Sequence, residues 1–257
     1  MGSHFQIHPL YRSYESEVHN FIDNFSTSGK LIYKGSRNEL RVKELDDIAI
    51  NIKRFKKPHI INQFAYRWLR MSKAKRSYLF ADHLLKKGVN TPHPIAYQED
   101  LSSLGLLKSY YVSVHQPYDF TIRALIYEPD FPEREEILRA FTRFTYDMHN
   151  KDILFTDHSP GNTLIKRTEC HQYDFYIVDL NRMKFKRLSF QERMQNFSRL
   201  TPEKEMHRIM ADEYAQLTKK DATEVFQWMW EEVKKARKKI ERKENFKRKI
   251  RSRKNNQ

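Results

Sequence analysis

Short apolar runs that alternate with polar positions follow one another through the first half of the chain, beginning after residue 29. Such alternation is typical of β-strands with one buried face. Five runs predict strands, at residues 31–33, 40–42, 48–52, 95–97 and 110–114. Helical spacing over 64–87 predicts helices that break near Ser72 and end at Gly88. We therefore expect a five-stranded antiparallel sheet with one main helix inserted after its third strand.

The second half of the chain changes to a helical period. An amphipathic helix is predicted over 133–150, and further helices over 189–200, 202–217 and 222–244. The buried side of the first is formed by Ile137, Leu138, Phe141, Phe144, Thr145 and Met148. The predicted class is α+β with two lobes, a sheet lobe at 30–116 and a mostly helical lobe at 117–232. A lead-in segment at 1–29, with a short helix around 15–25, precedes them.

Composition places the chain among ordinary globular proteins. It has 257 residues, of which 39% are hydrophobic and 13% aromatic, enough for two lobes with real cores. Its one cysteine, Cys170, excludes a disulfide framework within the chain and favours a reducing compartment. The first 30 residues lack the apolar run of a signal peptide, so we expect a cytoplasmic location.

The positive charge is concentrated at the end of the sequence. The chain carries a net charge of +15, and residues 233–257 hold 13 Lys and Arg against only Glu241 and Glu244. A basic tail of this kind attracts polyanions such as anionic lipid headgroups or nucleic acid. We expect an anionic membrane surface as the partner and regard nucleic acid as the less favoured alternative.

The residue pattern that carries the chemistry lies at 155–164 and reads F-T-D-H-S-P-G-N-T-L. Asp157 is followed five residues later by Asn162, and a β-type run at 176–178 then ends in Asp179. Phosphoryl transfer of the protein-kinase kind needs such a set. One aspartate orients the attacking hydroxyl, while an asparagine and a second aspartate hold the Mg²⁺ ions of ATP. Each of these motifs is common in unrelated proteins, but their occurrence together in this order is specific for a kinase-like arrangement.

Candidate nucleotide contacts lie in the predicted sheet lobe. Lys53 ends the third predicted strand, where a kinase places the lysine that binds the α- and β-phosphates. The turn at 34–38 contains Gly35 and Ser36, whose backbone N–H groups are candidates to cover the phosphates, although a plain hairpin turn explains it equally well. The polar connector at 115–119 suits a hinge whose backbone groups bind adenine.

These residues resemble the lipopolysaccharide core kinase family, whose members phosphorylate Kdo or heptose and are similar in fold to eukaryotic protein kinases. The resemblance rests on Asp157–Asn162, on V-D-L-N-R at 178–182, on S-K-A-K-R at 72–76, on I-K-R-F at 52–55 and on the stretch 84–96. It implies a protein-kinase-like two-lobed fold and an ATP-dependent, Mg²⁺-dependent sugar kinase. A lipopolysaccharide precursor or another anionic sugar would be the acceptor, at the inner face of the inner membrane.

The same resemblance assigns roles to single residues. Lys53 would bind the α- and β-phosphates, Asp157 would be the catalytic aspartate, and Asn162 and Asp179 would ligate Mg²⁺. Gly35 and Ser36 would lie over the phosphates, and the backbone from Ser113 to His115 would meet the adenine. Arg182 and Lys184, just after the metal-binding aspartate, are candidate acceptor contacts, with a solvated charged loop as the alternative.

One departure from the family pattern leaves other functions open. Kinases pair the strand lysine with a helix glutamate, but no carboxylate occurs between Lys53 and Asp82. The family's glutamate position falls near Ser77, so Asp82 is a candidate substitute. A pseudokinase or nucleotide-binding module without transfer activity is therefore one alternative. A kinase-like small-molecule phosphotransferase of the aminoglycoside or choline type is another.

Overall fold

The computed structural model describes residues 2–57, 70–103, 105–169 and 172–255. The chain forms two compact units. The first comprises Met1–Pro117 and Tyr176–Asn181, and the second comprises Tyr118–Phe175 and Arg182–Gln257. Each unit has its own cluster of buried apolar side chains.

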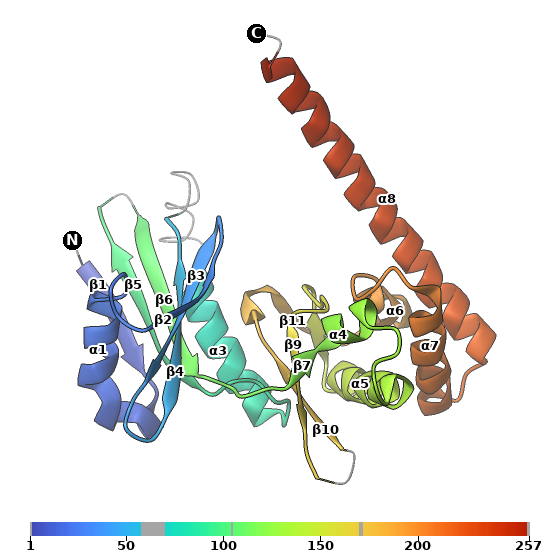
Figure 1. Ribbon diagram of the computed structural model, residues 1–257, viewed down its shortest axis with the longest axis horizontal. Helices are drawn as coiled ribbons and strands as arrows, with labels where there is room; N and C mark the ends of the chain where they lie inside the picture. Colours follow the sequence, from blue (N-terminus) through green and yellow to red (C-terminus); the bar gives the residue numbers. More distant parts are fainter. Residues whose placement is uncertain (1, 58–69, 104, 170–171, 256–257) are drawn as a thin grey trace. The chain divides into compact units, whose positions relative to one another are not determined.

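The first unit is built on an antiparallel sheet with the strand order β1-β5-β6-β4-β3-β2 (Figure 1). Its strands are β1 (Gly2–Ile7), β2 (Lys30–Lys34), β3 (Asn38–Glu44), β4 (Ala49–Phe55), β5 (Pro94–Leu101) and β6 (Leu106–Val114). All five predicted strands are confirmed. The described residues add a sixth strand, because β1 from the predicted lead-in segment pairs with β5 at the sheet edge.

A helix covers each face of this sheet. The alternation of a strand sends Ile50 and Ile52 to one face, where they pack against helix α1 (Glu15–Asp23). Phe55 points to the other face and packs against helix α3 (Lys73–Lys86). The predicted start of a helix after Ser72 is confirmed, because the Ser72 hydroxyl caps α3 by accepting a hydrogen bond from the Lys75 amide at 3.1 Å. The predicted helical residues 64–69 lie outside the described residues.

The end of α3 is also where the sequence placed it. Gly88 adopts a left-handed conformation with φ of 66°, which ends a helix at little steric cost for glycine. The Val89 amide then donates to the Leu84 carbonyl at 2.9 Å. A short 3₁₀ helix, η1 (Pro9–Tyr14), joins β1 to α1 in the same unit.

The second unit is mainly helical. Its helices are α4 (Ile122–Tyr127), α5 (Arg134–Asn150), α6 (Phe190–Phe197), α7 (Lys204–Thr218) and α8 (Ala222–Asn255). Short strands pair in the orders β10-β9-β7 and β11-β8. These are β7 (Phe120–Thr121), β8 (Ile153–Phe155), β9 (Thr163–Arg167), β10 (Tyr173–Ile177) and β11 (Met183–Phe185). The last two residues of β10 and the first two of the 3₁₀ turn η2 (Leu180–Arg182) belong to the first unit. The predicted buried side of α5 is confirmed, with Phe144 partly rather than fully buried.

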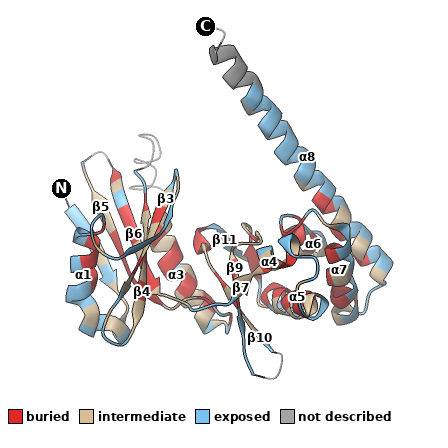
Figure 2. Ribbon diagram, in the orientation of Figure 1, coloured by how far each residue is buried: buried red, intermediate tan, exposed pale blue. Residues whose placement is uncertain are grey.

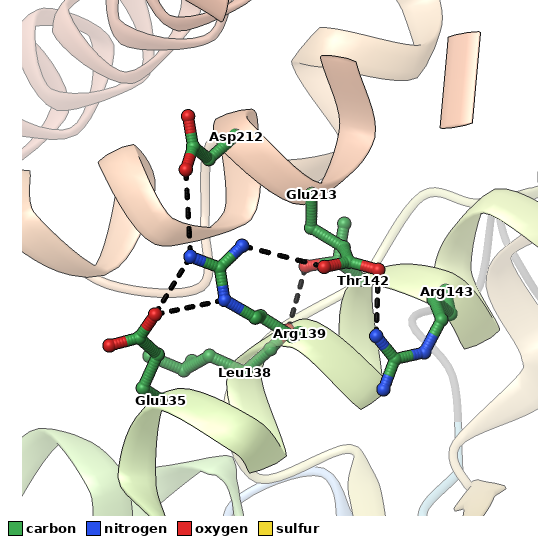
Figure 3. A network of polar contacts seen from close by, with 7 residues as sticks. All are labelled: Glu135, Leu138, Arg139, Thr142, Arg143, Asp212 and Glu213. Atoms are coloured by element: carbon green, nitrogen blue, oxygen red, sulfur yellow. Dashed lines mark hydrogen bonds and ion pairs between the residues drawn. The ribbon is translucent and has the colours of Figure 1, made fainter. Parts of the chain in front are cut away.

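An ion-pair network joins α5 to α7 (Figure 3). Glu213 of α7 is buried and accepts hydrogen bonds from Arg143 at 2.7 Å and from Arg139 at 3.4 Å. Arg139 also pairs with Glu135 at 2.7 Å, one helical turn away on α5. A buried carboxylate is tolerated only when such partners satisfy it, so the network fixes how these two helices pack.

Helix α8 extends beyond its predicted end. Val225, Met229 and Val233 are fully buried, and α8 packs there on α6 and α7. After Ala236, every residue whose side chain is described is exposed, and the helix continues to Asn255 (Figure 2). The end predicted at 244 was therefore too early. No described helix has the length and apolar character needed to cross a membrane.

Candidate active site

The first part of the candidate site is an ion pair inside the first unit. Lys53 lies in β4, between Leu40 of β3 and Tyr111 of β6 in the sheet register. Its ammonium lies 2.7 Å from Asp179 Oδ1. Two residues separated by 126 positions, each selected from the sequence for phosphate or metal chemistry, are thus in direct contact.

Asp179 is held in an unusual backbone conformation. Its φ of 61° lies in the left-handed region, which costs energy for a residue other than glycine and is often found at functional sites. Asn181 Nδ2 donates a hydrogen bond to Asp179 Oδ1 at 2.6 Å. Both contacts fall on Oδ1, while Oδ2 makes no hydrogen bond with the described residues. One oxygen of a partly exposed carboxylate is therefore open to a ligand.

The strand before Asp179 is tied to the rest of the first unit by its neighbours. The Ile177 amide donates to the Asn90 carbonyl at 3.1 Å, and the Thr91 hydroxyl donates to the Ile177 carbonyl at 2.7 Å. Thr91 is buried, so this hydrogen bond is shielded from water. These contacts fix the segment that carries the metal-binding candidate.

The carboxylate that pairs with Lys53 is Asp179, whereas the sequence suggested Asp82. Asp82 pairs with Lys86 at 2.7 Å, one turn along α3, and not with Lys53. The reason is helical geometry, because residues four apart lie on one side of a helix and a short aspartate reaches its neighbour first. Ser77, at the expected glutamate position, is buried in α3.

The second part of the candidate site is the loop after β8, inside the second unit. The His158 amide donates to the Phe155 carbonyl at 3.1 Å, and the Asn162 amide donates to the Ser159 carbonyl at 2.9 Å. Asn162 Nδ2 also donates to the Asp157 carbonyl at 2.9 Å. The asparagine therefore closes the loop that carries Asp157 and keeps its own Oδ1 available as a ligand atom.

Two arginines converge on the Asp157 carboxylate. Arg199 Nη1 lies 2.8 Å from Oδ1, and Arg182 Nη1 lies 3.5 Å from Oδ2. Arg182 was a predicted acceptor contact, and the structure brings it to the catalytic candidate. Arg199 was not found from the sequence, because it lies 42 residues beyond Asp157 in a short turn after α6 and no motif marks it.

A buried polar chain supports the same loop from beneath. Asn196 Nδ2 donates to the Phe155 carbonyl at 2.7 Å, while its Oδ1 lies 3.0 Å from His149 Nε2. His149 Nδ1 lies 3.0 Å from the Tyr214 hydroxyl. Burial lowers the pKa of His149 to about 3, so its imidazole is neutral and donates from Nε2. The packed histidine of α5 thereby helps to hold the strand that leads into Asp157.

The predicted nucleotide contacts lie at the turn between β2 and β3 and at the end of β6. The turn is closed by a hydrogen bond from the Gly35 amide to the Asn38 carbonyl at 2.9 Å, and Ser36 is exposed. Ser113 is buried within β6. The His115 amide donates to the Ala49 carbonyl at 2.7 Å, so this donor is already engaged. Adenine recognition at these residues stays a prediction.

Oxygen donors suited to Mg²⁺ are present in both units. The described residues contain no group of three or more His, Cys, Asp or Glu side chains that would hold a metal by itself. Mg²⁺ usually needs only one or two protein oxygens, because water and substrate phosphates complete its shell. Asp179 and Asn162 each offer such an oxygen, and their donor chemistry fits this ion. Lys184, the remaining acceptor candidate, lies exposed in β11 opposite Leu154.

Comparison with known proteins supports the fold. No protein-family model and no curated protein matches the chain at the level of sequence. Solved structures do match, and one of them is WaaP in complex with acyl carrier protein. It is 16% identical to this chain, with a TM-score of 0.60 over 91% of this chain and 99% of that one. The predicted α+β, protein-kinase-like fold with a sheet lobe and a helical lobe is thereby confirmed.

Proposed function

We propose that the protein is an ATP-dependent kinase that transfers the γ-phosphate to a hydroxyl of a lipopolysaccharide inner-core sugar, Kdo or heptose. The observation that carries the proposal is the contact of Lys53 with Asp179, with Asp179 held by Asn181 in a left-handed conformation. The structural likeness to WaaP supports a kinase-type scaffold, and the motif resemblance supports the sugar acceptor.

The residues of the site divide the work of phosphoryl transfer. Lys53 binds the α- and β-phosphates of ATP, and Asp179 and Asn162 would hold Mg²⁺ through their side-chain oxygens. Mg²⁺, when bound, neutralises charge on the phosphates. Asp157 orients the acceptor hydroxyl and accepts its proton as the new P–O bond forms and the bond from the γ-phosphorus to its bridging oxygen breaks. Most of the rate gain comes from positioning and electrostatics.

Loss of the Asp157 carboxylate tests this assignment. The protein is incubated with Mg·ATP and acceptors that bear Kdo or heptose, and phosphate on the acceptor is measured. Asp157→Ala is expected to lower turnover by about 10² to 10⁴-fold, the usual contribution of a positioned proton acceptor. Asp130→Ala, at an exposed aspartate of the same unit, serves as the control and should retain activity. Full turnover by the Asp157 variant would refute the assignment.

A nucleotide-binding module without transfer activity is the second candidate function. Its supporting observation is that Lys53 pairs with Asp179 and Asp82 pairs with Lys86, so α3 contributes no carboxylate to the lysine. Mg·ATP binding by calorimetry, without phosphate transfer to Kdo, heptose, aminoglycoside or choline acceptors, would favour it. Transfer to an aminoglycoside or choline alone would instead identify a small-molecule phosphotransferase.

We also propose that the exposed part of α8 binds an anionic membrane surface. Met229, Val233, Ala236 and Ile240 follow a spacing of four and three residues, so one apolar stripe continues from the buried part into the exposed part. Ile240 and Phe246 are 51% and 65% exposed among lysines and arginines. A basic helix with exposed apolar side chains suits the lipid interface, whereas a second copy would be repelled by its like charge.

Vesicle binding checks the role of α8. The full chain is expected to sediment with vesicles containing about 30% anionic lipid, since each basic residue near such a surface contributes about 1 kcal/mol. Binding should fall at high salt, with neutral vesicles, and in the double variant Ile240→Gln/Phe246→Gln. Equal binding to neutral vesicles, or salt-dependent binding to RNA without binding to vesicles, would refute the membrane partner.

A further inference from the structure

Three arginines surround the loop that carries Asp157, and each comes from a different part of the second unit. Arg199 and Arg182 contact the two carboxylate oxygens at 2.8 and 3.5 Å. Arg123 of α4 lies over Gly161 in the same loop, where its guanidinium would lie 3.1 Å from a Cβ at that position. Any side chain larger than glycine at 161 would therefore press on Arg123.

The charges at this place do not balance. Asp157 supplies one negative charge, while Arg182 and Arg199 supply two positive charges. Each guanidinium has five N–H donors, and the contacts with Asp157 use a single nitrogen of each. Among the described residues, no other carboxylate pairs with either arginine. Both side chains are 48% exposed, so donors and excess charge are accessible to a ligand from solution.

We infer that Arg199 and Arg182 bind an oxyanion of the acceptor, a carboxylate or a phosphate ester, beside the hydroxyl that Asp157 orients. This inference rests on the proposed kinase function and narrows its substrate class. Arginine suits the role because its planar fork binds carboxylate or phosphate through two parallel hydrogen bonds.

The competing explanation is that the arginines only hold Asp157 in place. The two roles differ in their dependence on acceptor charge. A positioning role would affect charged and uncharged acceptors equally, because Asp157 serves both. An oxyanion site affects only the acceptor that carries the anion, and it acts on the KM for that acceptor while ATP binding stays unchanged.

Matched acceptors separate the two explanations. We compare the methyl glycoside of Kdo with its uncharged carboxamide, and a heptose glycoside with its phosphate ester, to distinguish the two sources of the oxyanion. The unmodified protein is expected to have a KM about 10 to 100-fold lower for the charged member of the preferred pair, the usual worth of a charged hydrogen bond. Arg199→Gln and Arg182→Gln should each reduce this preference, and Arg199→Lys should restore part of it.

Arg187→Gln is the control, because this exposed arginine of the same segment makes no contact with Asp157 in the structure. It should leave the preference unchanged. An equal loss on charged and uncharged acceptors in Arg199→Gln would overturn the inference. If no acceptor is phosphorylated, the kinase proposal fails, and NMR binding of the same sugars decides the oxyanion site separately. Preferential binding of a charged sugar that Arg199→Gln abolishes would support the site, and binding without charge preference would overturn it.

Discussion

Asp179→Asn is expected to lower phosphoryl transfer by at least about 10³-fold while leaving the protein folded. Asparagine keeps the shape of the side chain but removes its negative charge. The substitution therefore removes both the ion pair with Lys53 and the charged oxygen that would ligate Mg²⁺. Activity is measured at saturating acceptor over a Mg²⁺ titration, and thermal unfolding is followed in parallel.

Two further variants make this expectation specific. Asp174→Asn is the control, because this aspartate lies in β10 five residues before Asp179 and has no partner among the described residues. It should retain activity. Asn181→Ala should give an intermediate loss and a higher Mg²⁺ requirement, since it removes only the hydrogen bond to Asp179 Oδ1. Transfer by Asp179→Asn at the rate of the unmodified protein would exclude Asp179 as the metal ligand.

Local patterns accounted for most of the fold. The strands β2 to β6 follow short β-prone runs bounded by polar turns, and α3 lies between a capping serine and a left-handed glycine. These signals act within a few residues, so a single sequence reveals them. β1 was not predicted, because most of its residues are polar or glycine and it shows no clear apolar run. It becomes a strand because it forms antiparallel hydrogen bonds with β5, about 90 residues later in the chain.

The residues of the candidate site could be predicted from local motifs, but the contacts between distant residues could not. Asp157, Asn162 and Asp179 were found because they recur at fixed spacings within short motifs. The partner of Lys53 and the contact of Arg199 with Asp157 depend on tertiary packing across 126 and 42 residues. No period or spacing encodes such contacts. Asp82 is the first carboxylate after Lys53 in the sequence and was therefore the candidate partner of that lysine. In the structure it pairs with Lys86 instead, one turn along α3.

Acid is expected to unfold the second unit between about pH 6.5 and 4.5, before its carboxylates are protonated. His149, His158 and His207 are buried there, and burial lowers their pKa values to about 3, 4 and 4 from an ordinary value of 6.5. In the unfolded chain these groups take up protons as the pH falls below 6.5. The folded chain does not, so the stability present above pH 6.5 is lost on acidification.

The expected slope is large because three groups act together. Each neutral buried histidine contributes up to about 1.4 kcal/mol per pH unit, so the three together approach about 4 kcal/mol per unit. The three groups together remove about 5 kcal/mol between pH 7 and pH 5. A protein at the lower end of the typical stability range of about 5–15 kcal/mol would therefore unfold near pH 5. Carboxylates of the same unit with lowered pKa values, such as Glu192, which accepts hydrogen bonds from the Lys186 side chain and the Ser189 amide, add to the loss only below about pH 4.5.

Urea unfolding measured at intervals from pH 7.5 to 5 tests this expectation. His149→Gln should reduce the slope of the free energy of unfolding against pH by about one third, because glutamine does not titrate in this range. Thr142→Ser, at a buried threonine of the same unit, is the control, because it removes a methyl group from the core but no titrating group, and it should leave the slope unchanged. A mutational change in overall stability shifts the whole curve but not its slope, so the two effects separate. A slope below that of one histidine would show that water reaches these imidazoles in the folded protein.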